Sequence, residues 1–191
     1  MSSTLVKWGR RAAIIPVAVA AYIAVAGLTG FCPNCANFMD SVLGRSHTPI
    51  TPGSPRGSIT TLAALDFDGQ PVSLAQYLGK PTIIDVWATW CPPCRQQRDV
   101  IHNLDPDFLS SVNIVSLSTD RSPADVAAFL AKHPSNITDL MATSDTLRAF
   151  GGVTAIPTLV FVDPSGQIRD VSTGVHSSSE LRRRVLGLTA N

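Results

Sequence analysis

The 191-residue sequence lacks a strong excess of either charge, and its formal net charge is +1 at pH 7. It has no basic patch of the kind that binds a phosphate backbone, so no nucleic-acid partner is expected. It also has no internal repeats, and its length and composition allow one modest domain plus an extension. Charge is missing altogether from residues 12–30.

The uncharged run is about as long as the roughly 20 residues that a helix needs to span a bilayer. Lys7, Arg10 and Arg11 precede it without an acidic residue. This charge pattern places the N-terminus in the cytoplasm and everything after the run outside. We therefore expect an uncleaved membrane anchor over residues 1–30. The alternative is a cleaved signal peptide, with a small-residue cleavage site at 24–26.

Cysteine is scarce, and its four copies form two Cys-x-x-Cys pairs, Cys32/Cys35 and Cys91/Cys94. A zinc site at the second pair would need two further ligands at suitable spacing, and none follows it. No metal and no other cofactor is expected there, and a redox pair is favoured. Ala36 follows the first pair, so that pair is not a haem-attachment motif.

Three interpretations of Cys32/Cys35 stay open. The pair is a second redox centre at the membrane surface that exchanges electrons with Cys91/Cys94, or it forms a small disulfide loop or an inter-chain link. A weak metal site with His47 is the least favoured. Residues 31–58 hold this pair and then a Pro-, Gly- and Ser-rich stretch that reads as a linker. The domain that follows spans residues 59–191.

The domain is organised around residues 82–94. Residues 82–88 are apolar and rich in β-branched side chains, which predicts a buried strand. Pro92 and Pro93 suit the first turn of a helix. The cysteines then lie at a helix start, where free N–H groups and the helix dipole stabilise a thiolate. Cys91 is predicted to be the exposed, low-pKa nucleophile, and Cys94 the buried thiol that resolves mixed disulfides.

Asp85 interrupts this strand, where an unpaired carboxylate is costly. A buried acid there should have a raised pKa and should exchange protons with Cys94. The alternatives are a carboxylate paired with a Lys or one at a sheet edge.

Residues 152–163 give a third signal, because Pro157 opens a strand-like run. A cis bond before Pro157 would fit, and the backbone of Ile156 would then offer hydrogen bonds to an extended peptide. An ordinary trans proline at a strand start is the alternative.

The helix after Cys94 should pack on the sheet through four apolar residues, Val100, Ile101, Leu104 and Phe108. Three basic residues fall outside that face: Arg95, Arg98 and His102. A terminal helix follows later in the chain, and its basic run at 182–184 is interpreted as a solvated face.

Three motifs carry a resemblance to a known family: Trp-Cys-Pro-Pro-Cys at 90–94, Asp-Val-Trp-Ala at 85–88 and Ala-Ile-Pro-Thr at 155–158. Together they resemble the membrane-anchored TlpA/ResA-like thiol–disulfide oxidoreductases of bacteria, over about residues 59–191. The segments 65–81 and 162–168 match the same family. The resemblance implies an α/β thioredoxin-like fold with a central mixed β-sheet flanked by helices. It also implies that Cys91 attacks, Cys94 resolves and Pro157 is a cis proline facing them.

The resemblance implies a disulfide reductase tethered to the bacterial inner membrane, with its catalytic domain on the periplasmic side. Apocytochrome c is the substrate class it suggests, and a membrane thiol-electron transporter would be the reductant. Substrate contacts are expected at four residues: Trp90, Pro92, Ile156 and Pro157. The alternatives are a disulfide oxidase or isomerase and a thiol-based copper chaperone.

Two sequence features bear on how well the Cys91 thiolate is stabilised. Pro92 and Pro93 have no N–H to offer a thiolate, which favours the reducing direction. Residues 95–99 carry no proline and are net basic, where the family often has an acid and then a proline. Their positive charge should favour the Cys91 thiolate.

Overall fold

The computed structural model describes residues 57–189. The anchor predicted over residues 1–30 and the Cys32/Cys35 pair lie outside this range. Within it, no helix has both the length and the apolarity to cross a membrane.

A seven-stranded sheet is built around β3 (Thr82–Trp87), every residue of which is buried. Strand β3 runs parallel to β4 (Asn113–Ser118) on one side and antiparallel to β6 (Thr158–Val162) on the other. Beyond β4 lies β5 (Thr138–Met141), which is parallel to it, and beyond β6 lies antiparallel β7 (Ile168–Thr173).

The sheet is completed by a short hairpin of β1 (Ala63–Leu65) and β2 (Pro71–Ser73), which pairs antiparallel with β5 through β1. The strand order is β2-β1-β5-β4-β3-β6-β7. The sheet is therefore mixed, as predicted, and β3 lies near its centre.

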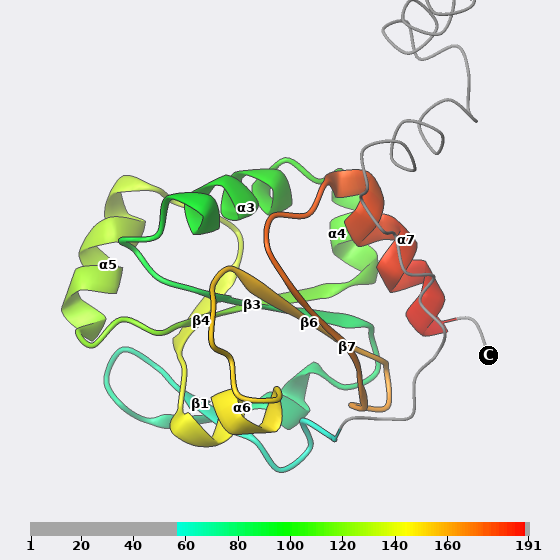
Figure 1. Cartoon of the computed structure of the whole chain (residues 1–191), viewed down its shortest axis with the longest axis horizontal. Helices are drawn as coiled ribbons and strands as arrows, with labels where there is room; N and C mark the ends of the chain where they lie inside the picture. The colour runs from blue at the N-terminus through cyan, green and yellow to red at the C-terminus, as the bar shows by residue number, and fades with distance from the viewer. Residues whose placement is uncertain (1–56, 190–191) are drawn as a thin grey trace, which may run out of the picture. The chain divides into compact units, whose positions relative to one another are not determined.

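Helices cover both faces of the sheet (Figure 1). The first face carries four helices: α3 (Pro92–His102), α4 (Pro106–Ser111), α5 (Pro123–Lys132) and α7 (Ser178–Thr189). The second carries the short 3-10 helix η1 (Leu74–Tyr77) and α6 (Ser144–Ala149). The predicted arrangement, a mixed sheet flanked by helices, is confirmed.

Three of these helices begin in the same way, with a capping side chain followed by proline. Cys91 caps α3, Asp105 caps α4 and Ser122 caps α5, and each side chain accepts a backbone N–H of its own first turn. Proline suits the next position because its missing N–H would be unpaired there in any case. This local chemistry fixes the start of α3 at the Cys-x-x-Cys pair.

The side chains of β3 alternate between the two faces of the sheet, which determines which of them lie beneath α3. Ile84 and Val86 belong to the core on the η1 and α6 side, whereas Ile83 packs in the core beneath α3, α4 and α7. Successive side chains of a strand point to opposite faces. Asp85 therefore shares the α3 side of the sheet with Ile83 and Trp87.

Two of the predictions for basic residues are wrong. Arg98 of α3 is buried between its helix and the sheet, because the sheet offers an acidic partner, Asp139. Arg184 is also largely covered, since it pairs with Asp170 and Glu180 and lies over the ring of Phe161.

Candidate active site

Cys91 and Cys94 are joined by a disulfide at the first turn of α3, with their Cα atoms 5.2 Å apart. The backbone N–H of Cys94 donates to the Sγ atom of Cys91 at 3.2 Å. Pro92 and Pro93 lie between them and have no N–H to add. The helix start therefore offers the Cys91 sulfur one backbone donor within the motif.

The two sulfurs differ in how well a substrate can reach them. Cys91 is 4% exposed and Cys94 is fully buried. The expectation of an exposed Cys91 is wrong in this disulfide form, because the residue packs with Trp87, Ala88 and Cys94. Cys91 is nevertheless the one of the two that solvent reaches.

The residues expected to contact a substrate differ in exposure, and Pro157 is buried. Trp90 is 68% exposed, and Pro92 is also exposed. The Ile156–Pro157 bond is cis, as predicted. The carbonyl oxygen of Ile156 lies 3.9 Å from the Cys91 Sγ atom, so the fold brings residues 65 positions apart together at the disulfide.

Asp120 was missed by the sequence analysis, although it holds the segment that leads into the motif. Its carboxylate accepts the N–H of Thr89 at 2.9 Å and the hydroxyl of Thr89 at 2.7 Å. The hydroxyl of Ser118 donates to the same carboxylate at 2.7 Å. Asp120 follows the end of β4, which runs parallel to β3, so its position next to Thr89 follows from the pairing of the two strands.

Asp85 is fully buried in the central strand, so the interpretation as a sheet-edge carboxylate is wrong. Its Oδ2 atom accepts the hydroxyl of Ser116 at 3.3 Å, and its Oδ1 atom has no hydrogen-bond partner among residues 57–189. Burial raises the pKa of Asp85 from 3.8 to about 7, against the opposing charge of Arg98 and the Ser116 hydrogen bond. The carboxyl can therefore exchange a proton near neutral pH.

Arg98 and Asp139 form a buried ion pair beside Asp85 that sequence reasoning did not find. Two guanidinium nitrogens of Arg98 donate to the two carboxylate oxygens of Asp139, at 2.7 and 3.1 Å. The Arg98 guanidinium also lies 4.1 Å above the ring of Trp87. No local signal marks this pair, because its members lie 41 residues apart on α3 and β5.

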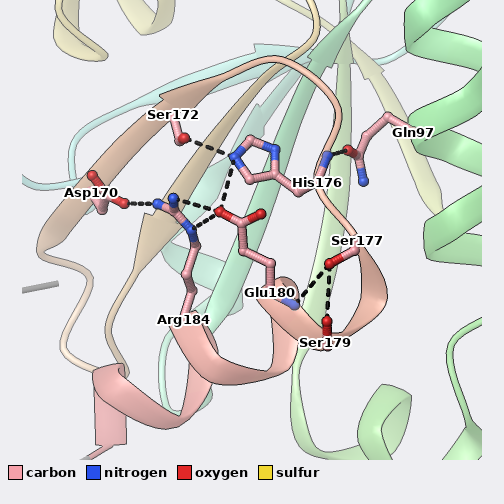
Figure 2. A network of polar contacts seen from close by, with 8 residues as sticks. All are labelled: Gln97, Asp170, Ser172, His176, Ser177, Ser179, Glu180 and Arg184. Carbon is pink, nitrogen blue, oxygen red and sulfur yellow. Dashed lines mark hydrogen bonds and ion pairs between the residues drawn. The ribbon is translucent and has the colours of Figure 1, made fainter. Parts of the chain in front are cut away.

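A second polar group connects α3 to α7 (Figure 2). The backbone N–H of His176 donates to the side-chain oxygen of Gln97 at 2.6 Å, and the His176 ring is 2.7 Å from the hydroxyl of Ser172. Glu180 lies 3.8 Å from the same ring and accepts two hydrogen bonds from Arg184. Burial lowers the pKa of His176, which keeps its ring neutral at pH 7.

Within residues 57–189, no three His, Cys, Asp or Glu side chains gather closely enough to hold a metal ion.

Comparisons with known proteins agree with this geometry. The family model described as Redoxin matches residues 51–184. The thioredoxin-like protein YneN of Bacillus subtilis is 26% identical over 135 residues, which are 69% of this chain and 76% of that protein. The thiol-disulfide oxidoreductase ResA of Bacillus subtilis is 27% identical over 115 residues, or 60% of this chain and 64% of ResA.

Among solved structures, that of MTB dsbF in its mixed oxidized and reduced forms superposes with a TM-score of 0.59 and 32% identity. The match covers 72% of this chain and all of that one. The seven-stranded sheet thus has the thioredoxin-like arrangement. We conclude that the chain belongs to the Redoxin family and is a thiol–disulfide oxidoreductase related to the TlpA/ResA-like proteins.

Proposed function

We propose that the protein reduces disulfides of exported proteins through the Cys91/Cys94 dithiol. The observation that carries the proposal is the asymmetry of the pair, since Cys91 is slightly exposed beside Ile156 and Cys94 is fully buried. Reduction of a disulfide needs one thiol that attacks the substrate and a second, protected thiol that resolves the mixed disulfide.

The reaction starts from the reduced pair. The Cys91 thiolate attacks a substrate disulfide, so that a Cys91–substrate disulfide forms and one substrate thiolate leaves. The Cys94 thiolate then attacks the Cys91 sulfur, which restores the Cys91–Cys94 disulfide and releases the second substrate thiolate. Two electrons pass from the protein to the substrate, and the substrate thiolates take up two protons.

Asp85 serves the second step as proton acceptor and donor. Cys94 must lose its proton before it attacks, yet both Cys94 and Asp85 are fully buried from solvent. Asp85 lies on the side of the sheet that α3 covers, and its pKa of about 7 gives it a mixed protonation state at neutral pH. A carboxyl with this pKa can accept the Cys94 proton and then pass it to the departing substrate sulfur.

The backbone at Ile156 and Pro157 supports binding of an extended substrate segment. The Ile156 carbonyl lies beside the Cys91 sulfur, and Trp90, next to Cys91 in the chain, presents a large exposed apolar surface. Together with Pro92, these residues would hold a peptide across the disulfide. Main-chain hydrogen bonding of this kind accepts many sequences, which suits a protein substrate.

The reducing direction is supported by the start of α3. A thiolate at Cys91 would receive the Cys94 N–H, but nothing from Pro92 or Pro93. Weak stabilisation of the reduced thiolate favours donation of electrons, whereas strong oxidants have a stabilised reduced form.

The sequence and the family resemblance support a membrane anchor and two kinds of partner. The uncharged run at 12–30, preceded by basic residues, would fix the chain in the bacterial inner membrane with residues 59–191 on the periplasmic side. A membrane thiol-electron transporter would then regenerate the dithiol, and apocytochrome c is the substrate class that the family resemblance suggests. In this scheme Cys32/Cys35 is a second redox pair at the membrane surface.

A trapping experiment with the full chain tests the cysteine roles. Cys94→Ser should accumulate a mixed disulfide between Cys91 and a scrambled or oxidised protein substrate, and dithiothreitol should release it. Cys91→Ser should trap nothing and lose insulin-reductase turnover. The Cys32→Ser/Cys35→Ser variant is the matched control, because it removes two thiols and should still turn over with a soluble dithiol. Trapping through Cys94 instead of Cys91 would contradict the proposal.

A further inference from the structure

Three polar residues form a row across the sheet beneath α3. Strand pairing places Asp85 of β3 opposite Ser116 of β4, and Ser116 opposite Asp139 of β5. Side chains directly opposite each other on neighbouring strands share a face of the sheet. The row therefore brings two carboxyl groups to one buried surface, with a hydroxyl between them.

Arg98 reaches this surface from α3, four residues after Cys94. Its two hydrogen bonds to Asp139, at 2.7 and 3.1 Å, form the two-pronged geometry of an ionised pair. A third bond to the hydroxyl of Ser135, at 3.3 Å, and the face of Trp87 fix the remaining side of the guanidinium. Both side chains of the pair are 8% exposed, so water screens their charges little.

The position of this guanidinium matters for Asp85. A cation without a partner in a buried site would bind the nearest carboxylate and keep it ionised. A carboxylate held ionised cannot carry a proton and give it back. In the structure two guanidinium nitrogens of Arg98 both donate to Asp139. Asp85 instead accepts its hydrogen bond from the neutral hydroxyl of Ser116.

We propose that Arg98 and Asp139 are positioning residues that set the charge around Asp85, so that Asp85 can both take up and return the Cys94 proton. This inference rests on the proposed function. The proton moves from the Cys94 sulfur to the Asp85 carboxylate, the Cys94 thiolate bonds to the Cys91 sulfur, and the Cys91–substrate bond breaks. The neutral Asp85 then gives the proton to the departing substrate sulfur.

The two members of the pair act on Asp85 with opposite sign. Burial raises the pKa of Asp85, the Arg98 charge and the Ser116 hydrogen bond lower it, and the Asp139 charge raises it. The charged groups that act on Asp85 are Arg98 from α3 and Asp139 from β5, whereas Leu159 opposite it on β6 is apolar. Removal of one partner should therefore have the reverse effect of removal of the other.

The test is a pH titration of the Asp85 carboxyl carbon by ¹³C NMR in the reduced full chain. The Asp85 signal is assigned by its absence in Asp85→Asn. We expect Asp139→Asn to lower the titration midpoint by about one pH unit or more, and Arg98→Gln to raise it. The rate at which Cys94 resolves a preformed Cys91 mixed disulfide should follow the same shifts in its pH profile.

Further variants keep the test decisive if a single variant folds poorly. Arg98→Gln/Asp139→Asn leaves no buried charge without a partner, and should still raise the midpoint, because Arg98 exerts the larger effect on Asp85. Arg98→Lys retains the charge and should restore most of the wild-type profile. Asp145→Asn is the control, since this exposed acid lies on α6, at the other face of the sheet.

Midpoints that do not move, or that move in the same direction in Asp139→Asn and Arg98→Gln, would overturn the proposal, since a purely structural pair predicts no reversal of sign. The carboxyl titration needs no substrate. It therefore decides the inference even if the Cys94→Ser trapping experiment defeats the proposed function.

Discussion

Two buried polar groups contact the same helix, α3, and they differ in what surrounds their titratable member. Asp85 lies in the group that includes Arg98 of α3, and one of its carboxylate oxygens lacks a partner among residues 57–189. His176 lies in the network that ties Gln97 to α7, where Glu180 and Arg184 are paired with each other (Figure 2).

The difference shows which group is shaped for proton transfer. A buried acid with a pKa near 7 costs stability whenever it ionises, so the ionised form of Asp85 does not help the fold. Burial instead keeps the His176 ring neutral, and the network around it connects two helices. We interpret Asp85 as a proton-transfer group and the His176 network as a structural connection between helices. The stability that Asp85 contributes should fall as the pH rises, whereas the stability that His176 contributes should fall as the pH falls.

The largest effect is expected on stability at alkaline pH. The pKa of Asp85 in the folded chain is about 7, above its ordinary value of 3.8, so its contribution to stability is complete below about pH 4 and is lost as the pH rises through 7. At about 1.4 kcal/mol per pKa unit, the loss reaches about 4 kcal/mol. Urea unfolding should find Asp85→Asn more stable than wild type at pH 8.5, with the gap closing towards pH 4. An equal gap at both pH values would contradict this account.

The same substitution should harm the reaction. Asp85→Asn removes the group that accepts the Cys94 proton, and such groups contribute about 10²-fold or more to rate. Single-turnover release of substrate from the Cys91 mixed disulfide should slow by about this factor near pH 7. Attack by Cys91 on the substrate should change much less. A variant that is more stable yet slower is the result that separates the two groups most clearly.

A smaller effect is expected in the second group. His176→Asn loses the ring's contact with Ser172, which should cost about 1–3 kcal/mol at pH 7.5. Because burial holds the pKa of His176 below 6.5, its contribution is present above pH 6.5 and is lost as the pH falls through the folded pKa. The variant should therefore show a flatter acid limb in urea unfolding between pH 5 and 7, with turnover within about twofold. If His176→Asn slowed the release of substrate from the Cys91 mixed disulfide as much as Asp85→Asn does, the distinction between the two groups would be wrong.

The smallest effect is expected at an ion pair that belongs to neither group. Arg148 and Asp145 pair on α6 with about three quarters of each side chain exposed. Exposed pairs contribute little, so Arg148→Gln should change the free energy of unfolding by less than about 0.5 kcal/mol. Its pH profiles of stability and turnover should overlay those of the wild type. A loss above 1 kcal/mol would show that exposure is a poor guide to the strength of charge interactions in this chain.

The sequence predicts the parts of the site that lie close together along the chain. The apolar run before Cys91, the two prolines after it and the acid within it are local signals, and they place β3, the start of α3 and Asp85. Pro157 was found because a proline opens a strand pattern. Each of these signals reflects a backbone preference or a burial cost that a single segment expresses alone.

The partners of these residues could not be predicted in the same way. Arg98 looked like a solvated residue on α3, because its partner Asp139 lies on β5, two strands away from β3. Gln97 and His176 meet across 79 residues, and Asp120 and Thr89 across 31. Such pairs depend on strand order and register, which periodicity within one segment does not determine.

The reduction potential of the Cys91–Cys94 pair tests the central claim, that the protein is a reductase, most directly. It can be measured by equilibration with dithiothreitol and glutathione buffers in a full chain that carries Cys32→Ser and Cys35→Ser. The single N–H donor at the start of α3 predicts a value close to that of thioredoxin, about −270 mV. A value close to that of DsbA, about −120 mV, would make the protein an oxidant and contradict the proposed direction.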